Sequence, residues 1–523
     1  MKKRILVIIM AAAMVFSLMI FPAGAADYKL GDVNSDGRVT PADVTALRLY
    51  LAGKTDETVT VHKQTADLNQ DGRVTPADVT TLRLYIAGKI DIGGSEEKTE
   101  LSAYTIVYPA EYTKYEMYAA ELLQDYVMDH FDVELPMTDD STAETEYEVL
   151  IGNTNRAASN TDISCNSGEY LLMSVGKKIV LQGKSYMIGG AVGALTYNGM
   201  RDSCVINSSI SDIAAPAAYT PLPATGVILM IGDGMGYNHI GGAERYYSRR
   251  DKTWDGFTAK EMPNQGSVST YCLDGKQLLK EGMFKKIVTD SAASGTAMAT
   301  GWKTYATYLG MNYKGEEITN VREIANSLGY KTGILTTDEA YKATPAAFTV
   351  HNISRYNYAE IQTAQQALLD GEDLSYLRGE VGEELLTQTK EVLDLVSTDS
   401  NGFFTMIEEA YTDIYAAPGH LTSDLLHAVA RIDSAVEYAM TFAAAHPDTV
   451  LIVTADHETG NLDESGVVSN NGAHTMKDVP IFAMGAGTEI FNGQRIENIE
   501  IGQFIASVYG VDEFGGFYDN IVD

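Results

Sequence analysis

Residues 227–236 read VILMIGDGMG. The first five of these residues are apolar, which is typical of a central strand in a parallel sheet that is covered on both faces. The strand then runs into Asp233, which lies between two glycines. Open α/β sheets bind ligands at the carboxyl ends of such strands. The stretch therefore predicts a doubly wound α/β domain with Asp233 at its ligand-binding edge.

Two further stretches have the same form. Residues 449–454 read TVLIVT and lead into Asp456-His457, and His474 precedes a third apolar run at 479–484. Aspartate followed by histidine offers one oxygen and one nitrogen donor, a combination that suits zinc. An isolated Asp-His pair is usually solvated. The prediction of a metal site therefore depends on these residues meeting Asp233 at one edge of the sheet.

Residues 288–301, VTDSAASGTAMATG, place Ser291 directly after Asp290 and before a run of small residues. This predicts a helix that leaves the Ser291 hydroxyl unobstructed at its N-terminus, where free N–H groups attract an anion. The alternative is a small-residue helix with an ordinary N-cap. The candidate metal ligands elsewhere in the chain favour a nucleophile that takes up a phosphoryl group.

Residues 221–523 resemble the alkaline phosphatases. The resemblance is carried, in family order, by VILMIGDGMG, VTDSAASGTAMATG, ATPAAFTVHNISR, GFFTMIEEAYTD, VLIVTADHETG and GAHTMKDVPIFAMG. It implies a mainly parallel sheet flanked by helices, two zinc ions and one magnesium ion. It also implies hydrolysis of phosphate monoesters through a phosphoserine intermediate. The implied residues are Ser291 as nucleophile and Arg355 as phosphate clamp; Asp233, Asp456 and His457 for one zinc; Asp413, His420 and His474 for the other; and Asp233, Thr344 and Glu408 for magnesium.

The second zinc site departs from the family pattern. Alkaline phosphatases carry a histidine four residues after the aspartate, and that position is Ala417 in this chain. His420 is the natural replacement if the loop at Pro418-Gly419 bulges. Without it, this zinc would be weakly held.

Two other departures concern the flank of the sheet. Lys342 stands where the family has Asp or His near magnesium, so it either reaches the phosphate or faces solvent. Residues 358–400 predict helices at 358–369 and 382–395, in place of a longer segment in the family. We therefore expect a shortened flank or a more open pocket.

Three functional classes remain after these observations. The first is a secreted phosphomonoesterase, and the second is a phosphodiesterase of the same superfamily. The third is a non-catalytic protein with a decayed site. A sulfatase is excluded because Ser291 is followed by Ala-Ala-Ser-Gly and lacks the Cys/Ser-x-Pro-x-Arg signature.

Residues 31–54 and 66–89 are near copies, GDVNSDGRVTPADVTALRLYLAGK and ADLNQDGRVTPADVTTLRLYIAGK. Each carries oxygen donors at EF-hand spacing, with aspartate at the closing position, and is followed by a predicted helix. The predicted calcium ligands are Asp32, Asn34, Asp36, Arg38 and Asp43, then Asp67, Asn69, Asp71, Arg73 and Asp78. Residues 27–92 resemble a type I dockerin, which implies two calcium ions and a cohesin module of a scaffold protein as partner. The alternative is a calcium-stabilised domain without a partner.

The remaining segments suggest an exported protein. Residues 1–25 combine a basic start, an apolar run and Ala23-Gly24-Ala25, which predicts a cleaved secretory signal; the alternative is a membrane anchor. We expect an extracellular protein, held at the cell surface where its scaffold is attached there. The net charge of −33 excludes nucleic acid and anionic lipid as partners, and no later segment is apolar enough to span a membrane.

Between the two recognisable modules lie a polar linker at 93–98 and a predicted small α/β domain at 99–215. The latter resembles, loosely, the non-catalytic domain that precedes hexosaminidase-type glycosidase barrels, through IVYPAEYTKYE, EVLIGNTNR and KKIVLQGKS. We expect a spacer or packing domain, with carbohydrate contact as the second option. Related phosphatases are often dimers, so a homodimer also stays open.

Overall fold

The structure is a computed structural model of the chain. It describes residues 30–34, 38–51, 63–68, 74–86, 99–161, 163–200, 205–206, 216–249, 254, 256–275, 284–398, 401–418, 420, 422–464, 467–469, 471–516 and 521–522. The chain divides into two compact units, 1–95 and 96–523, and each is described by itself. The predicted signal segment 1–25 and linker 93–98 lie outside the described residues.

The N-terminal unit consists of α1 (Pro41–Leu51), α2 (Lys63–Ala66) and α3 (Pro76–Ile86). Proline occupies the first position of α1 and of α3, where its missing N–H costs no helical hydrogen bond. Leu47 and Leu82, at equivalent positions of the two repeats, are fully buried in one small apolar cluster. The repeat in the sequence thus becomes a pair of helices that share a core.

The large unit is built on an eight-stranded sheet of order β14-β13-β15-β9-β16-β19-β10-β20. The strands are β14 (Tyr376–Arg378), β13 (Lys331–Thr336), β15 (Phe403–Glu409), β9 (Gly226–Gly232), β16 (Thr449–Thr454), β19 (Val479–Met484), β10 (Asn264–Ser269) and β20 (Arg495–Glu497). The first five run parallel, and β19 is antiparallel to both β16 and β10. Because β9 lies between β15 and β16, the carboxyl ends of these three strands meet at one edge.

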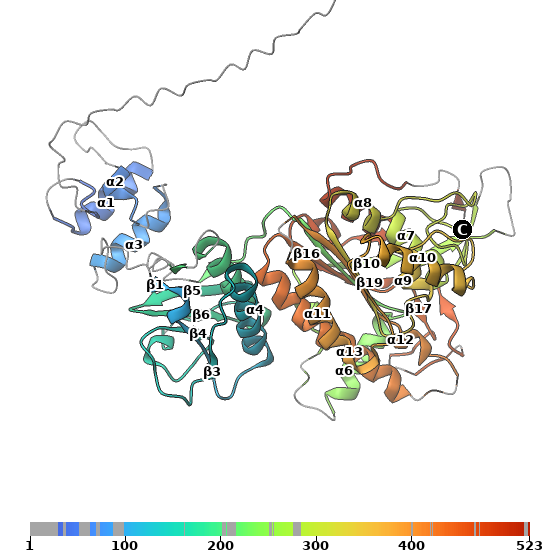
Figure 1. Cartoon of the computed structure of the whole chain (residues 1–523), viewed down its shortest axis with the longest axis horizontal. Coiled ribbons are helices and arrows are strands. Elements are labelled where there is room, and N and C mark those ends of the chain that lie inside the picture. The colour runs from blue at the N-terminus through green and yellow to red at the C-terminus, as the bar shows by residue number, and fades with distance from the viewer. Residues whose placement is uncertain are drawn as a thin grey trace, which may run out of the picture. The chain divides into compact units, whose positions relative to one another are not determined.

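Helices cover both faces of the sheet (Figure 1). On one face α8 (Val321–Ser327) and α9 (Ala343–Ala347) contact the strands, and α7 (Ser291–Thr300) and α14 (Asn498–Val508) pack on them. On the other face lie α11 (Leu385–Ser397) and α13 (Thr422–Ala445), with α6 (Tyr237–Tyr247) against α13. This is the expected α/β architecture, with a sheet that is mainly parallel.

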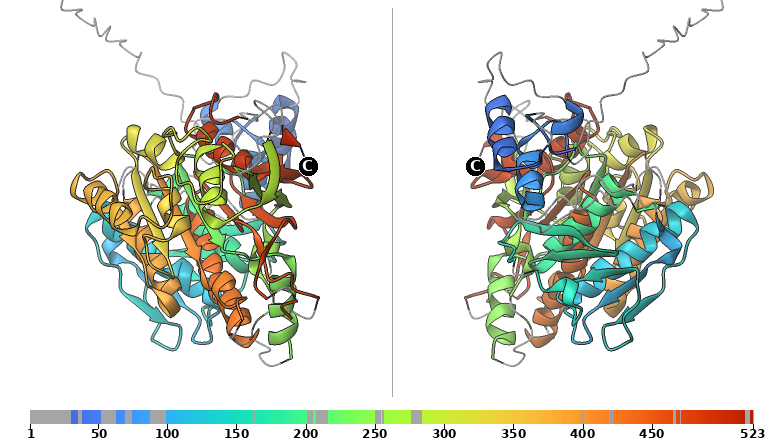
Figure 2. Two further views of the ribbon diagram at one scale, coloured as in Figure 1. Left: turned by 90° about the vertical axis from the view of Figure 1, so that its right-hand side faces the viewer. Right: turned by 90° about the vertical axis from the view of Figure 1, so that its left-hand side faces the viewer.

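Residues 99–215 form a second, six-stranded sheet of order β3-β2-β4-β6-β5-β8, with the last strand at 217–218. Its strands are β2 (Thr105–Tyr108), β3 (Met137–Asp139), β4 (Glu148–Ile151), β5 (Glu169–Val175), β6 (Lys178–Gly183) and β8 (Ala217–Ala218). Figure 2 shows these green strands in front in its right-hand view, with the cyan helix α4 (Lys114–Phe131) beside them. The short strands β1 (Thr99–Glu100) and β7 (Val205–Ile206) pair separately.

The second sheet belongs to the same compact unit as the first because its helices pack on α13. Gly189 and Gly193 of α5 (Ile188–Ala194) approach α13 so closely that a Cβ on either would collide with the carbonyl of Thr441 or Ala445. Small residues at four-residue spacing let two helix backbones pack directly. The helices α4 and α5 therefore share one apolar core with the large sheet.

Residues 358–398 contain two helices, α10 (Tyr358–Asp370) and α11, close to the predicted boundaries. The sequence interpretation missed β14 between them, a three-residue edge strand. So short a strand forms no clear period-two pattern. Among the described residues, no helix combines the length and apolar character needed to cross a membrane.

Candidate active site and metal centre

Ser291 is the first residue of α7, a helix whose ten residues are all buried. Asp290 caps it, because its side chain accepts the N–H of Ala293 at 3.1 Å. Gly301 ends the helix with φ 71°. Small side chains are required along α7, since it packs between α9 and α14. The serine hydroxyl thus lies at the positive end of a buried helix.

Two candidate ligands contact that hydroxyl, and a third contacts one of them. Ser291 Oγ lies 3.3 Å from Asp233 Oδ2 and 3.2 Å from His457 Nε2. The same nitrogen lies 3.3 Å from Asp233 Oδ1 and 3.2 Å from Asp456 Oδ2. Asp233 follows β9 and Asp456 follows β16, two neighbouring parallel strands, which explains why the three groups converge. Asp233, Asp456 and His457 form a buried group whose geometry can hold one cation.

The hydrogen-bond pattern of this group fits a metal. Asp456 Oδ1 accepts the N–H of Gly234 and of His457, each at 2.9 Å. Asp456 Oδ2 and Asp233 Oδ1 are buried and accept no hydrogen bond. Burial, together with Asp456, Asp413 and Glu408, holds the pKa of Asp233 well above its usual value. Buried carboxylate oxygens without donors are costly unless a cation compensates them.

Asp413, His457 and His474 form a second group, which is less buried. His474 Nε2 lies 3.4 Å from Asp413 Oδ1, and the rings of His457 and His474 stack at 3.6 Å. The short strands β17 (Glu458–Thr459) and β18 (His474–Thr475) pair here and bring the two histidines together. Burial lowers the pKa of His474, but hydrogen bonding to Asp413 and the charge of that carboxylate outweigh this effect and raise the pKa to about 9.

His420 lies outside both groups. Its side chain is exposed, and its ring lies 5.2 Å from that of Tyr415. Ala417, four residues after Asp413, lies instead beside the His474 segment: a Cβ on Gly472 would come within 2.7 Å of Ala417 Cα. Among the described residues, the second group therefore consists of Asp413, His474 and the shared His457, and Ala417 stands where the family pattern has a histidine.

A further buried histidine, His239 of α6, lies in the same region and interacts electrostatically with Asp413 and His457. Its Nδ1 accepts the N–H of Gly236 at 3.1 Å, so the ring proton belongs on Nε2. Burial lowers the pKa of His239 to about 3. A neutral ring with its proton on Nε2 is not a metal donor, so His239 does not replace the histidine of the family pattern.

The three predicted magnesium ligands lie at the same edge of the sheet. Glu408 is in register with Ile231, directly before the end of β9, and accepts the Thr336 hydroxyl at 2.5 Å. Burial raises the pKa of Glu408 to about 8. The Thr344 hydroxyl is buried and lies beside Glu408, whose pKa it lowers by hydrogen bonding against the effect of burial. Carboxylate and hydroxyl oxygens of this kind suit magnesium.

Lys342 and Arg355 have well-defined partners. Lys342 Nζ lies 3.0 Å from Glu339 and over the ring of Tyr358. Its ammonium group therefore lies against Glu339 and the first residue of α10. Arg355 Nη1 lies 3.2 Å from Asp290 Oδ2, the carboxylate that caps the serine helix. This ion pair holds the guanidinium beside the N-terminus of α7, where an anion would bind.

Comparison with known proteins identifies both modules. Residues 224–382 and 372–468 match the family Alkaline phosphatase, and residues 30–87 match the Dockerin type I domain. The large unit thus matches the alkaline phosphatase family over residues 224–468, and the N-terminal unit matches the type I dockerin over residues 30–87. The chain is 28% identical over 316 residues to alkaline phosphatase 4 of Bacillus subtilis, covering 49% of this chain and 65% of that protein. It is 36% identical over 183 residues to the alkaline phosphatase of Escherichia fergusonii, covering 34% and 36%.

The chain thus spans less than two thirds of the length of these relatives. Among solved structures, the alkaline phosphatase of the Antarctic bacterium TAB5 is 24% identical, with a TM-score of 0.46. The superposition covers 56% of this chain and 100% of that one.

Sequence reasoning missed several residues that orient the phosphatase site. The Thr459 hydroxyl contacts Asp413 Oδ1 at 2.5 Å and His457 Nδ1 at 3.1 Å, and the carbonyl of Thr289 contacts His474 Nδ1 at 2.9 Å. Such contacts fix the ring orientation of metal-binding histidines. Thr459 lies in the motif DHETG, so its position was a usable signal; a backbone carbonyl gives none.

In the dockerin, the closing aspartates of the two loops make equivalent contacts. Asp43 Oδ2 accepts the N–H of Thr40 at 2.7 Å, and Asp78 Oδ2 accepts that of Thr75 at 2.7 Å. Both carboxylates are fully buried. The predicted ligands Asp36, Asn69, Asp71 and Arg73 lie outside the described residues. The described ones are Asp32, Asn34, Arg38, Asp43, Asp67 and Asp78.

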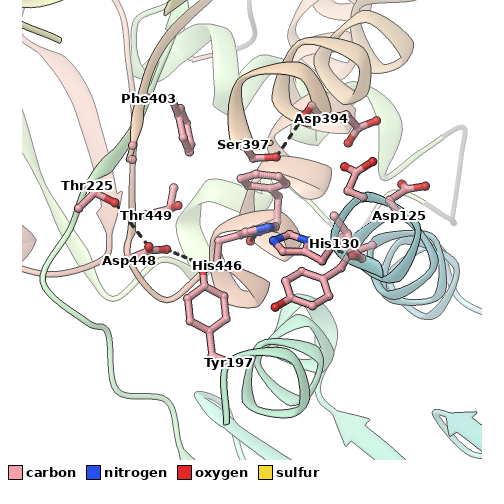
Figure 3. A pocket seen from close by; sticks show the side chains of 16 residues that line it. Asp125, His130, Tyr197, Thr225, Asp394, Ser397, Phe403, His446, Asp448 and Thr449 are labelled. Carbon is pink, nitrogen blue, oxygen red and sulfur yellow. Dashed lines mark hydrogen bonds between the residues drawn. The ribbon is translucent and has the colours of Figure 1, made fainter. Parts of the chain in front are cut away.

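A cavity of about 270 Å³ lies at the opposite, amino end of the same strands. Gly226, Phe403 and Thr449, the first residues of β9, β15 and β16, line it. Figure 3 shows Asp125 and Asp394 near each other on two neighbouring helices, with Asp448 on the opposite side of the view. The cavity belongs to the contact between α4 and the large sheet, and Ser291 does not line it.

Proposed function

We propose that the chain is an extracellular metal-dependent phosphomonoesterase in which Ser291 is the nucleophile. The observation that carries this proposal is the position of Ser291 Oγ, within 3.3 Å of two candidate metal ligands at the N-terminus of a buried helix. The match to the alkaline phosphatase family supports the reaction class. The mixed oxygen and nitrogen donors favour zinc in two groups, Asp233, Asp456 and His457, and Asp413 and His474.

Ser291 would attack the phosphorus atom of a monoester. The Oγ–H proton passes to solvent as the bond between Oγ and phosphorus forms, the ester bond breaks, and the alcohol leaves with a proton from solvent. Water then attacks phosphoserine, loses a proton to solvent and releases inorganic phosphate, while Ser291 regains its proton. Cations held by the two groups would supply positive charge at this edge of the sheet, where negative charge develops on the reacting oxygens.

Arg355 would bind the non-bridging oxygens of the phosphoryl group. A guanidinium presents parallel N–H donors that match a dianionic phosphate, and Asp290 holds it at the helix end. This feature favours a monoester over a diester, which offers one negative charge less. Magnesium held by Asp233, Thr344 and Glu408 would neutralise the carboxylates behind the reacting group.

The test is release of p-nitrophenol from p-nitrophenyl phosphate at alkaline pH, with zinc and magnesium supplied. Wild type should turn over, while Ser291→Ala and chelator-treated enzyme should not. Bis(p-nitrophenyl) phosphate is the matched substrate for the diesterase alternative, and faster cleavage of it would favour that class. Equal inertness of wild type and Ser291→Ala would leave the decayed-site alternative.

We also propose that the dockerin binds two calcium ions and attaches the enzyme to a cohesin of an extracellular scaffold. The match of residues 30–87 to the dockerin family and the equivalent contacts of Asp43 and Asp78 support this. Capture on immobilised cohesin should require calcium. Capture that persists in excess chelator would contradict it, and light scattering of the captured enzyme would distinguish a monomer from a homodimer.

A further inference from the structure

Four buried residues form one line of hydrogen bonds that ends at a candidate metal ligand. Lys303 Nζ donates to Asn498 Oδ1 at 2.5 Å and to the carbonyl of Tyr271 at 3.0 Å. Asn498 Nδ2 donates to Ser294 Oγ at 2.8 Å. Ser294 Oγ donates to the carbonyl of Asp456 at 2.5 Å. The reaction proposed above uses none of the first three side chains.

The chemistry of these groups gives the line a single direction. A carbonyl oxygen can only accept a hydrogen bond, so the Ser294 hydroxyl donates to the carbonyl of Asp456. Ser294 Oγ then accepts from the amide nitrogen of Asn498, which leaves the Asn498 oxygen to accept from Lys303 Nζ in either protonation state of the amine. Each residue orients the next.

Lys303 is an expensive group to keep at this position. Its side chain is 2% exposed, its nearest carboxylate is Glu497 at 4.0 Å, and the ring of Tyr271 lies 3.9 Å from Nζ. Burial lowers the pKa of Lys303 to about 7. An apolar side chain would avoid the desolvation cost of a buried amine. The buried amine instead donates the hydrogen bonds that begin the line, to Asn498 and to the carbonyl of Tyr271.

The last link joins the two parts of the active site. Ser294 lies three residues after Ser291 on the same helix, and Asp456 presents its unpartnered Oδ2 toward His457. The bond from Ser294 to Asp456 therefore fixes the serine helix against the strand end that carries the metal ligands. Residues that orient metal ligands typically change metal affinity by about 10- to 100-fold.

We propose that Lys303 and Asn498 are positioning residues that set the zinc affinity of the group Asp233, Asp456 and His457 through Ser294. The proposal rests on the proposed function, since it assumes zinc at that group. Its readout is zinc retention rather than turnover, so the two can fail separately.

The experiment measures zinc Kd of the full chain by competition with a chromogenic chelator. Asn498→Asp keeps the contact with Lys303 but accepts from Ser294 where Asn498 donates, so the Asp456 carbonyl loses its partner. We expect its zinc Kd to rise about tenfold or more, and that of Lys303→Met to rise several-fold. Kinetics should show a lower kcat at saturating substrate that excess zinc restores.

Thr296→Val is the matched control. Thr296 is a fully buried residue of the same helix, and its hydroxyl donates to the carbonyl of Tyr308 at 2.9 Å. Its loss should lower Tm and leave zinc Kd within twofold. If Asn498→Asp and Lys303→Met both retain zinc like this control, the line is only structural and the proposal is wrong. Should Asn498→Asp fail to fold, Lys303→Met alone decides. Zinc binding by wild type without phosphatase activity would overturn the proposed function only.

Discussion

Carboxyl groups gather at both ends of the same parallel strands, buried at the carboxyl ends and half-buried or exposed at the amino ends, and the two ends accommodate them differently. At the carboxyl ends, Asp233, Glu408 and Asp456 lie beside histidines, and some of their oxygens accept no hydrogen bond. At the amino ends, Asp448 accepts hydrogen bonds from Tyr197 and Thr225 at 2.9 and 3.4 Å. Asp125 and Asp394 instead repel each other electrostatically at the contact with α4.

The difference shows what separates the candidate metal-binding cluster from the acidic cluster at the other end of the strands. The negative charge at the carboxyl end is suited to bound cations, because histidine nitrogens lie beside carboxylate oxygens that accept no hydrogen bond. At the amino end, burial raises the pKa of Asp125 to about 6 and that of Asp394 to about 7. Protonation can therefore neutralise part of the negative charge there, as bound cations would at the carboxyl end. Burial and acidity alone do not define a metal site.

The largest expected effect separates the two ends by activity. Asp456→Asn should lower kcat/KM by about 10²- to 10³-fold, since it removes one electrostatic contact at the reacting centre. Asp394→Asn should leave kcat/KM within about twofold, because substitutions away from the reacting centre and from tightly packed sites usually have small effects. Hydrolysis of p-nitrophenyl phosphate measures both. Equal losses of kcat/KM in the two variants would show that the two ends of the strands do not differ in their role in catalysis.

The second effect concerns stability on metal removal. Zinc at a hundredfold excess over Kd should stabilise the folded chain by about 2.7 kcal/mol, because it binds the native state only. Calorimetry with zinc and with chelator gives the difference. Asp394→Asn should show the same dependence as wild type, whereas Asp456→Asn should lose most of it.

The third effect concerns the zinc affinity of the second group, which consists of Asp413, His457 and His474. Ala417→His restores a histidine one helical turn after Asp413, beside the His474 segment. The weaker zinc should then bind about tenfold more tightly, a gain of roughly 1.4 kcal/mol. The control is His420→Ala, which should leave zinc affinity unchanged because the exposed ring lies against Tyr415. A large loss in His420→Ala would instead show that the loop moves to bind metal.

The smallest effect is a pH dependence at the amino end. Below about pH 4, Asp394 is protonated in both the folded and the unfolded chain, so it does not change the free energy of unfolding. Between pH 4 and 7 the unfolded chain releases the proton while the folded chain holds it, so stability falls as pH rises through that range. Asp125, Asp129 and Glu121 face Asp394 as acids, and Lys390 is the cation beside them.

Asp394→Asn should remove this dependence, with a gain of about 1 kcal/mol at pH 8 and little change at pH 4. Urea unfolding at the two pH values measures it. Asp448→Asn is the comparison variant, because that carboxylate already accepts two hydrogen bonds and should be destabilised at both. A gain for Asp394→Asn at pH 4 equal to that at pH 8 would refute the carboxyl repulsion.

Much of the catalytic unit was predictable from the sequence, because its signals are local. The apolar run 227–231 specifies a central strand, and glycine and aspartate after it specify the ligand edge. The small residues of 291–301 specify a helix that must pack closely. The repeats at 31–54 and 66–89 specify two equivalent helices. In each case neighbouring residues carry the physical cause, namely side-chain size, periodicity or backbone freedom.

Only the tertiary structure decided which side chains meet. His420 turns to Tyr415, Lys342 pairs with Glu339, and Arg355 pairs with Asp290. The line from Lys303 to Asp456 joins residues more than 150 positions apart in the sequence. A loop path and the direction of hydrogen bonds depend on residues brought together by the sheet and its helices, and no local pattern encodes them. The sequence indicated that Ser291 and its candidate ligands share one edge of the sheet; the fold decided which of these side chains lie within reach of one another, because that depends on contacts between distant segments.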